Sequence, residues 1–249
     1  MRFALEQFDA VLAVRDADGK PYLLIGGQAV YFWASRYATE EISLEQWRPF
    51  SSADIDFRGG RDDVINIARQ LGRTPKFPHR IEMTALAGII PFTVADEPAA
   101  IEVVRSIPGV KPEEAAKLAV EREFLGKLIR VLDPISLLCC KARLALKVDQ
   151  KQRRDVEHLQ IMTVCVRAFL RETLRGIEAG ELSARGWLAA VERVLKLAES
   201  TTGRKVARKF GVDWQQVLPE KEIIASKHRL VVSFREKRLL QWREKVARS

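Results

Sequence analysis

Hydrophobic residues recur along this chain with two different periods, and the change falls near residue 130. Before it, short apolar runs bounded by Gly, Pro and Asp favour strands with helices between them. Beyond it, apolar residues return every three or four positions, which is typical of amphipathic helices. We therefore expect a mixed α/β domain at residues 1–132, followed by a helical domain at 133–249.

The same pattern locates the individual elements. In the first part it predicts helices at 3–15 and about 62–70, and strands before Gly26, around Asp54, within 80–92 and at 100–105. Residues 120–132 have the pattern of a hairpin that turns near Gly126, and Asp133-Pro134 supplies an N-cap and a first-turn proline for the next helix. Further helices are predicted at 134–148, 151–171, 184–199, 203–210 and 228–247.

The most informative stretch lies between residues 23 and 57. An apolar strand runs into Gly26-Gly27, a helical segment follows, and a second strand carries Asp54 and Asp56. Side chains alternate between the faces of a strand, so the two aspartates point the same way while their apolar neighbours enter a core. Carboxylates on one face repel each other unless a cation lies between them. Oxygen ligands of this kind favour Mg²⁺ or Mn²⁺, which often complete their coordination with substrate phosphates.

The glycine pair fits the same chemistry. Residues without a Cβ let the backbone approach a phosphate, and amides at a helix N-terminus attract anions. Ser52 shares the face of Asp54, where its hydroxyl can touch a phosphate or simply hydrogen-bond its own loop. Taken singly, Gly26-Gly27 is a tight turn and the two aspartates are a solvated strand end. Their order along the chain favours phosphoryl transfer.

That order, strand, Gly-Gly, helix and Asp-x-Asp strand, resembles the nucleotidyltransferase fold of the DNA polymerase β superfamily. The resemblance implies a mixed sheet with flanking helices in the first domain. The resemblance implies a third carboxylate on a neighbouring strand, for which Glu102 and Glu82 are the candidates. We prefer Glu102, because the stretch from Ile101 to Gly109 resembles the apolar-acid-apolar strand and short Pro-Gly loop of many such enzymes. The alternative is that both glutamates are exposed strand acids.

Two later segments resemble the AbiEii-type nucleotidyltransferases, a toxin–antitoxin family. They are the first predicted helix after the hairpin, which carries Lys141, and the next helix, which carries Asp155. The resemblance implies that Lys141 contacts the nucleoside triphosphate and that Asp155 lies near the transfer site. The alternative is that Lys141 is a basic residue at the edge of an amphipathic helix. An arginine and a hydroxyl residue before the first aspartate also fit this family, as Arg48 with Ser51 or Ser52.

Charge is distributed unevenly along the chain. Residues 1–125 hold 15 Lys/Arg and 19 Asp/Glu, so their net charge is −4. The remaining residues hold 27 Lys/Arg and 14 Asp/Glu, so their net charge is +13, and the whole chain has +9. A basic half suits a nucleic-acid substrate, since cationic side chains release condensed counterions from phosphates. A well-solvated helical surface is the alternative.

Composition narrows the class of protein. With 249 residues, 47% of them hydrophobic and 30% charged, the chain is an ordinary globular protein of one large or two modest domains. No apolar run approaches the ~20 residues of a membrane-spanning helix, and the N-terminus lacks the apolar block of a signal peptide. We therefore expect a cytoplasmic protein without a membrane partner. Cys139, Cys140 and Cys165 indicate neither a disulfide framework nor a metal knuckle.

The sequence thus predicts a metal-dependent nucleotidyltransferase that moves a nucleoside monophosphate from a nucleoside triphosphate to an acceptor hydroxyl. By resemblance, the acceptor is RNA, such as a transfer RNA end, and the chain is a toxin with a cognate antitoxin protein. The alternatives are a small-molecule acceptor of the antibiotic type, and a catalytically idle module that binds nucleic acid or a partner. The predicted catalytic residues are Asp54, Asp56, Glu102, Lys141 and Asp155, the nucleotide-binding residues Gly26, Gly27, Ser52 and Lys141, and the ligands of Mg²⁺ or Mn²⁺ are Asp54, Asp56 and Glu102.

Overall fold

The computed structural model describes residues 1–79, 81–151 and 153–247. The chain forms two compact units. The first, here called the sheet unit, comprises residues 1–36 and 45–140, and the second, the helical unit, comprises 37–44 and 141–249. This division falls inside a helix, after Cys140, and assigns a short segment, 37–44, to the helical unit. The domain boundary predicted after residue 132 stays a prediction.

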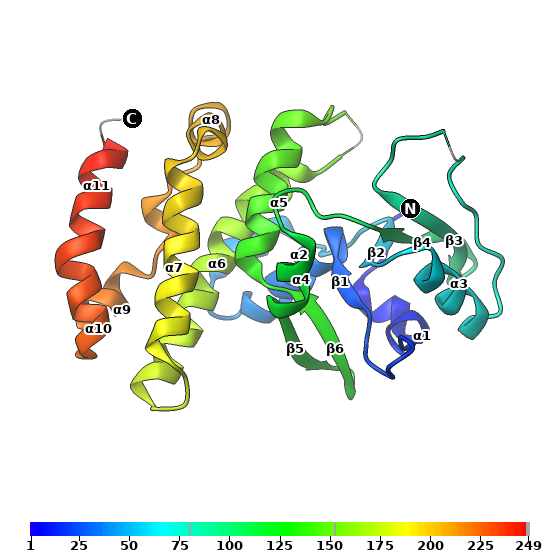
Figure 1. Cartoon of the computed structure of the whole chain (residues 1–249), viewed down its shortest axis with the longest axis horizontal. Helices are drawn as coiled ribbons and strands as arrows, with labels where there is room; N and C mark the ends of the chain where they lie inside the picture. The colour runs from blue at the N-terminus through cyan, green and yellow to red at the C-terminus, as the bar shows by residue number, and fades with distance from the viewer. Residues whose placement is uncertain (80, 152, 248–249) are drawn as a thin grey trace. The chain divides into compact units, whose positions relative to one another are not determined.

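The sheet unit contains a mixed six-stranded sheet in the order β3-β4-β2-β1-β6-β5 (Figure 1). Central strand β1 pairs antiparallel with β2 and parallel with β6, and β2 pairs parallel with β4. Apolar residues of one face, among them Leu24, Phe57 and Val103, are buried in the core. The predicted mixed sheet is therefore confirmed. Its strands are β1 (Leu23–Ile25), β2 (Asp54–Arg58), β3 (Leu86–Val94), β4 (Glu97–Val104), β5 (Ala119–Phe124) and β6 (Lys127–Leu132).

Helix α2 (Gly26–Tyr37) forms the core of this unit and begins directly after β1 without a loop. Residues 29–34 are all buried, as expected of a helix that is apolar on every side. The indole Nε1 of Trp33 donates a hydrogen bond of 2.9 Å to the carbonyl of Leu132 on β6. This packing holds the first turn of α2 fixed at the end of β1.

Two predicted elements differ from the observed ones. The helix expected at 3–15 is reduced to η1 (Leu5–Phe8) and α1 (Asp9–Leu12), because the backbone of Phe3 pairs with that of Ser52 before it and the backbone of Arg15 pairs with that of Pro21 after it. The strand expected within 80–92 begins only at Leu86; its first residue, Arg80, lies outside the described residues. The side chains of Ile81 and Met83 are exposed, and among the described residues no strand pairs with this segment. The unit also contains the end of η2 (Ile42–Trp47), α3 (Arg61–Gln70), α4 (Pro112–Lys117) and the start of α5 (Pro134–Lys147).

The helical unit is built around α6 (Asp155–Glu178), against which α7 (Ala184–Glu199) packs (Figure 1). The predicted helix at 151–171 starts later and runs longer, and residue 152 within it lies outside the described residues. The helix predicted at 228–247 is interrupted by a π-helical turn, η4. In the described part of the chain, no helix combines the length and the apolar character needed to cross a bilayer. The other elements are α8 (Thr201–Phe210), η3 (Gln215–Val217), α9 (Glu220–Ala225), α10 (Arg229–Ser233), η4 (Phe234–Leu239) and α11 (Leu240–Ala247).

A buried carboxylate explains why residues 37–44 belong to the helical unit. Glu41 accepts hydrogen bonds of 2.6 Å from Arg167 and 2.8 Å from Arg171, both on α6. Burial alone would raise the pKa of Glu41, but the two guanidinium groups outweigh it and hold this pKa below its usual value. Glu41 therefore stays charged and fixes this segment to α6.

Candidate active site

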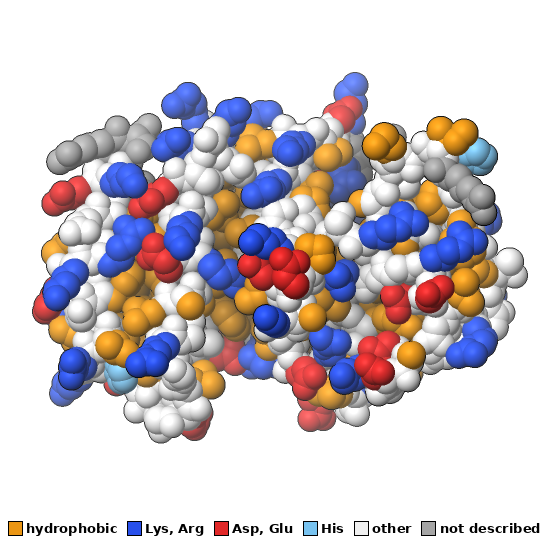
Figure 2. All heavy atoms as spheres, in the orientation of Figure 1, with side chains coloured by type: hydrophobic (Ala, Val, Ile, Leu, Met, Phe, Trp, Pro, Cys, Tyr) orange, Lys and Arg blue, Asp and Glu red, His pale blue; other side chains and the backbone are white. Residues whose placement is uncertain are grey.

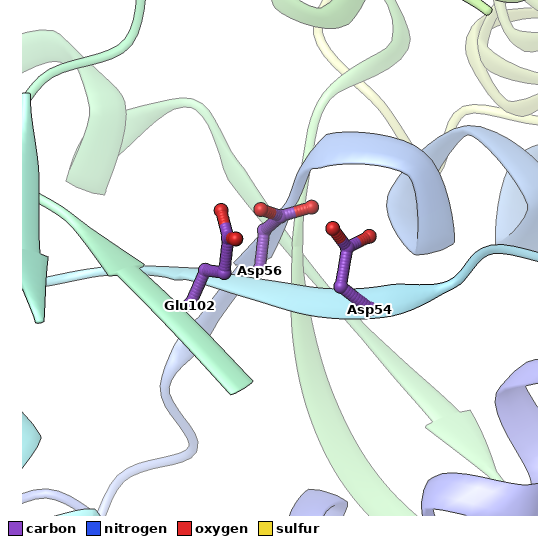
Figure 3. A group of neighbouring side chains, drawn as sticks. All are labelled: Asp54, Asp56 and Glu102. Carbon is purple, nitrogen blue, oxygen red and sulfur yellow. The ribbon is translucent and has the colours of Figure 1, made fainter. Parts of the chain in front are cut away.

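Three carboxylates converge on one face of the sheet. In the parallel pairing of β2 with β4, Asp56 lies opposite Glu102, and residues in register on neighbouring strands share a face. Ligand oxygens of Asp54, Asp56 and Glu102 all lie within 4.8 Å of one another, and all three side chains are half-buried (Figure 3). Glu82 is exposed in the segment before β3. The structure thus brings Glu102, rather than Glu82, to the two aspartates.

This carboxylate group has the chemistry of a divalent-metal site. Mg²⁺ binds oxygen ligands at about 2.1 Å in an octahedron, so oxygens that share one ion lie about 3–4.2 Å apart. A spread of 4.8 Å accommodates one ion after small rotations, and also the two ions, about 3.5–4 Å apart, of a two-metal site. The residues therefore fit the predicted divalent cation, and they do not distinguish Mg²⁺ from Mn²⁺.

Gly26 lies directly against this group. Its neighbour Ile25 pairs with Asp56, and Gly26 adopts a φ of +68°, in the left-handed region. A Cβ at this position would lie 1.8 Å from Oδ2 of Asp56, so only glycine fits. Gly27 follows as the second residue of α2, so the backbone amides of the first turn begin beside the carboxyl group of Asp56. Such amides attract anions, in keeping with the predicted phosphate contact, which stays a prediction.

Ser52 orients the first aspartate. Its Oγ donates a hydrogen bond of 3.0 Å to Oδ1 of Asp54, and its backbone is held by pairing with Phe3. The predicted contact of Ser52 with a phosphate stays a prediction. Arg48 is exposed and donates two hydrogen bonds, of 2.6 and 3.1 Å, to Glu45. The carbonyl of Ser51 accepts a hydrogen bond of 3.0 Å from Arg2.

Lys141 and Asp155 are paired with each other in the helical unit. The Nζ atom of Lys141 lies 2.9 Å from Oδ1 of Asp155, and Nε of Arg153 lies 2.6 Å from Oδ2. The side chains of Lys141 and Asp155 are only 6% and 2% exposed. Burial would raise the pKa of Asp155, but Lys141 and Arg153 outweigh it and lower this pKa. Their predicted roles in nucleotide transfer stay predictions.

Sequence reasoning passed over Arg58, which shares the face of the carboxylates. It follows Asp56 by two residues on β2, so the same alternation that paired the aspartates places Arg58 beside them. The alternation of side chains along a strand was enough to place Arg58 on this face, but an arginine does not by itself indicate a metal site.

Similarity to known proteins lies in the structure rather than in the sequence. No protein-family model matches the chain, and no curated protein matches it. Among solved structures, the chain is similar to the crystal structure of an antigenic nucleotidyltransferase-like protein from Paracoccidioides brasiliensis, with 11% sequence identity and a TM-score of 0.44. The match covers 67% of this chain and 78% of that one. Because this likeness is so distant, we infer fold and function only from the strands and side chains of this chain.

Proposed function

We propose that this chain is a metal-dependent nucleotidyltransferase, which transfers a nucleoside monophosphate from a nucleoside triphosphate to an acceptor hydroxyl. The observation that carries the proposal is the convergence of Asp54, Asp56 and Glu102 beside the first turn of α2. A carboxylate group next to helix N-terminal amides offers a cation site and an anion site side by side, which is what a metal-bound triphosphate requires.

Each residue has a distinct role in this proposal. Asp54, Asp56 and Glu102 would hold the divalent ions. When bound, such ions neutralise charge that develops on the phosphates and position the reacting oxygens. The amides of Gly26 and Gly27 contact the phosphates of the donor, and Ser52 keeps the carboxylate of Asp54 in its orientation through its hydrogen bond.

The reaction exchanges one phosphorus–oxygen bond for another. The acceptor hydroxyl oxygen forms a bond to the α-phosphorus, and the bond from that phosphorus to the bridging oxygen breaks, so pyrophosphate leaves with the electron pair. The hydroxyl proton passes to a base. Family resemblance assigns this base to Asp155 and a triphosphate contact to Lys141. Both oxygens of Asp155 already accept hydrogen bonds, so these roles require the pair to separate.

We further propose an RNA acceptor, supported by the charge of the helical unit. Helix α8 carries four exposed cations and no acid, and none of the four has an ion pair within the described residues; Figure 2 shows Lys and Arg side chains gathered at the position of this helix. They are Arg204, Lys205, Arg208 and Lys209. A transfer RNA end as the acceptor, and a role as a toxin with a cognate antitoxin protein, rest on the sequence resemblance alone.

The test is to incubate the purified protein with each labelled nucleoside triphosphate, Mg²⁺ or Mn²⁺, and total RNA. Wild-type protein is expected to label RNA ends, and Asp56→Asn is expected to reduce labelling to background. Asp62→Asn, which alters an exposed acid in the first turn of α3, serves as a control and should retain full activity. If the label appears in small hydroxyl compounds but not in RNA, the acceptor is a small molecule rather than RNA.

Melting temperatures separate loss of function from loss of fold. Without metal, Asp56→Asn should melt at or above the temperature of the wild type, because the substitution relieves repulsion among the carboxylates. Adding Mg²⁺ or Mn²⁺ should stabilise the wild type more than the variant, because binding to the folded state shifts the unfolding equilibrium. Undiminished transfer by folded Asp56→Asn would remove the metal-dependent mechanism.

A further inference from the structure

Two arginines flank the central strand on the face that carries the carboxylates. Arg58 at the end of β2 and Arg130 on β6 both lie opposite Leu23 of β1, one on each side. Residues in register share a face, and Arg58 shares the face of Asp56 because the two are separated by two positions. Two strand spacings, about 9.6 Å, separate the arginine backbones, a span that two long side chains can close around one small group.

Within the described part of the chain, neither guanidinium is bound by another group of the protein. Arg58 and Arg130 form no hydrogen bond and no ion pair with the described residues, although both are half-buried. Other half-buried arginines behave differently; Arg171, for instance, binds Glu41 and Glu222. A guanidinium presents five N–H donors in a planar fork that matches the oxygens of a phosphate or a carboxylate.

Both arginines line one small cavity, together with Leu23, Gly59 and Ala116. Its volume is about 150 Å³. Pockets that enclose drug-sized ligands have volumes of roughly 300–1,000 Å³, so this cavity is too small for a whole nucleotide. It therefore suits a single anionic group.

The acids of this cavity decide which anion it favours. Asp63 accepts a hydrogen bond from the amide of Gly60, and Asp16 accepts from the amides of Asp18 and Lys20, so the backbone holds both carboxylates in place. With two arginines and two aspartates, the lining has no net formal charge. A neutral lining gives a second negative charge no net attraction to offset its larger cost of desolvation, so the cavity favours a singly charged phosphodiester over a multiply charged free phosphate. The two guanidinium forks can hold such a group by direct contact.

The position of the two arginines along the sheet indicates whether the bound phosphate belongs to the donor triphosphate or to the acceptor. Strands β1 and β2 are antiparallel, with Ile25 opposite Asp56 and Leu23 opposite Arg58. Gly26-Gly27 therefore lies toward the Asp54 end of β2, whereas Arg58 lies about 7 Å along the strand on the other side of Asp56. In phosphoryl transfer, the attacking and leaving oxygens are roughly in line, so the acceptor approaches from the side opposite the leaving pyrophosphate.

We propose that Arg58 and Arg130 form a subsite for a backbone phosphodiester of the nucleic-acid acceptor, next to the hydroxyl that is modified. This inference rests on the proposed function, since it takes the donor phosphates to lie at Gly26-Gly27. It assigns the sheet unit its own acceptor contact, independent of the cations on α8.

The first test measures binding without any chemistry. Fluorescence anisotropy with a labelled single-stranded RNA oligonucleotide, in the absence of nucleoside triphosphate, is followed over a series of salt concentrations. Arg58→Gln and Arg130→Gln should each weaken binding several-fold and reduce the slope of log affinity against log salt by roughly 0.7. Arg58→Lys retains the charge and should retain the slope. Arg185→Gln, which removes an exposed charge in the helical unit, should change neither markedly.

The second test is the steady-state rate of transfer. Both Gln variants should raise KM for RNA and leave KM for the nucleoside triphosphate unchanged, with melting temperatures like that of the wild type. A raised KM for the triphosphate instead, or competition by inorganic phosphate or pyrophosphate that the variants abolish, would assign the subsite to a free phosphate and overturn the inference. Equal RNA binding by wild type and variants would also overturn it.

The two proposals can fail separately. If the wild type transfers nucleotides but the arginine variants bind RNA normally, the subsite is wrong and the proposed function stands. If the arginine variants lose RNA affinity but no transfer occurs under any condition, the contact of both arginines with RNA stands, whereas the proposed function and the acceptor role of the subsite are wrong.

Discussion

At the scale of single residues, the candidate site depends on Gly26 as much as on the carboxylates. Its missing side chain leaves the space that the carboxyl group of Asp56 occupies, and its left-handed φ turns β1 directly into α2. An acid residue is easily recognised in a sequence, whereas this requirement for empty space becomes visible only in the structure.

Gly26→Ala is therefore expected to abolish transfer, because the new Cβ displaces the carboxylate of Asp56. Gly72→Ala is the matched control: Gly72 has a similar φ of +62°, but no atom of the described residues lies within 4 Å of its Cβ position. Both substitutions should lower the free energy of unfolding by about 1–2 kcal/mol through backbone strain. Urea unfolding and transfer assays on both variants check this. An equal loss of transfer in both variants would show that backbone strain, rather than the collision with Asp56, reduces activity, and full activity of Gly26→Ala would contradict the prediction.

The buried pair of Lys141 and Asp155 gives a second prediction. Asp155→Asn should lower the free energy of unfolding at pH 7 by about 3–5 kcal/mol, because Lys141 is left buried without its partner. The pKa of Asp155 is lowered in the folded state, so its contribution is present above the unfolded pKa of about 3.9 and is lost as the pH falls through the folded value. Urea unfolding should show the gap between wild type and variant narrowing below about pH 4.

A double variant separates the structural role of this pair from a catalytic one. Lys141→Met combined with Asp155→Leu replaces the ions with apolar side chains, which is often neutral for stability. Normal folding with loss of transfer would support the predicted catalytic roles. Normal folding with normal transfer would show that the pair serves only the structure.

At the scale of elements, prediction from sequence succeeded where burial and pattern agree. Alternation predicted the shared face of the two aspartates on β2, and apolar runs predicted both β2 and β4, because one face of each strand is buried. The position of Glu102 was expected only from the family resemblance. Prediction failed at Ile81 and Met83, whose propensity for strand is not matched by a neighbouring strand in the described part of the chain. It also failed at Arg58, since only the register with Leu23 and Arg130 shows that two arginines lie on one face.

The interior of α6 supplies a third prediction. Burial, and to a smaller extent the charge of Glu41, raises the pKa of the Cys165 thiol far above its usual range. A maleimide reagent at pH 8 should therefore label the half-buried Cys139 in the folded protein well before Cys165. Mass spectrometry of peptides from time points checks the order, and labelling in urea should remove the difference. Rapid labelling of folded Cys165 would contradict the burial of this helix.

At the scale of the whole molecule, charge is the property most closely tied to the proposed acceptor. The carboxylates and the glycine pair belong to the sheet unit, and α8, whose four cations have no ion pair within the described residues, belongs to the helical unit. The sequence alone shows that the second half of the chain is the basic one. It does not show that some of these cations are neutralised by ion pairs, such as those of Arg238 with Glu192 and Glu199.

Replacing the four cations of α8 with Gln should reduce the salt dependence of RNA binding. Each phosphate contact on a single strand contributes roughly 0.7 to the slope of log affinity against log salt, so the slope should fall by up to about 2.8. Anisotropy titrations check the slope. Lys227→Gln with Arg229→Gln, two exposed cations elsewhere in the helical unit, is the control and should alter it less. An unchanged slope in the α8 variant would exclude this helix from the RNA contact.

The pairing of Asp56 with Glu102 also governs when the site comes into existence during folding. Strands β2 and β4 are parallel and separated by the whole of residues 59–96, so no tight turn sets their register; the burial of Ile55, Phe57, Ile101 and Val103 does. A slip of one residue would turn Glu102 into the core and separate it from Asp54 and Asp56. A growing chain on the ribosome therefore lacks the complete group of three carboxylates until β4 has emerged and docked in its final register.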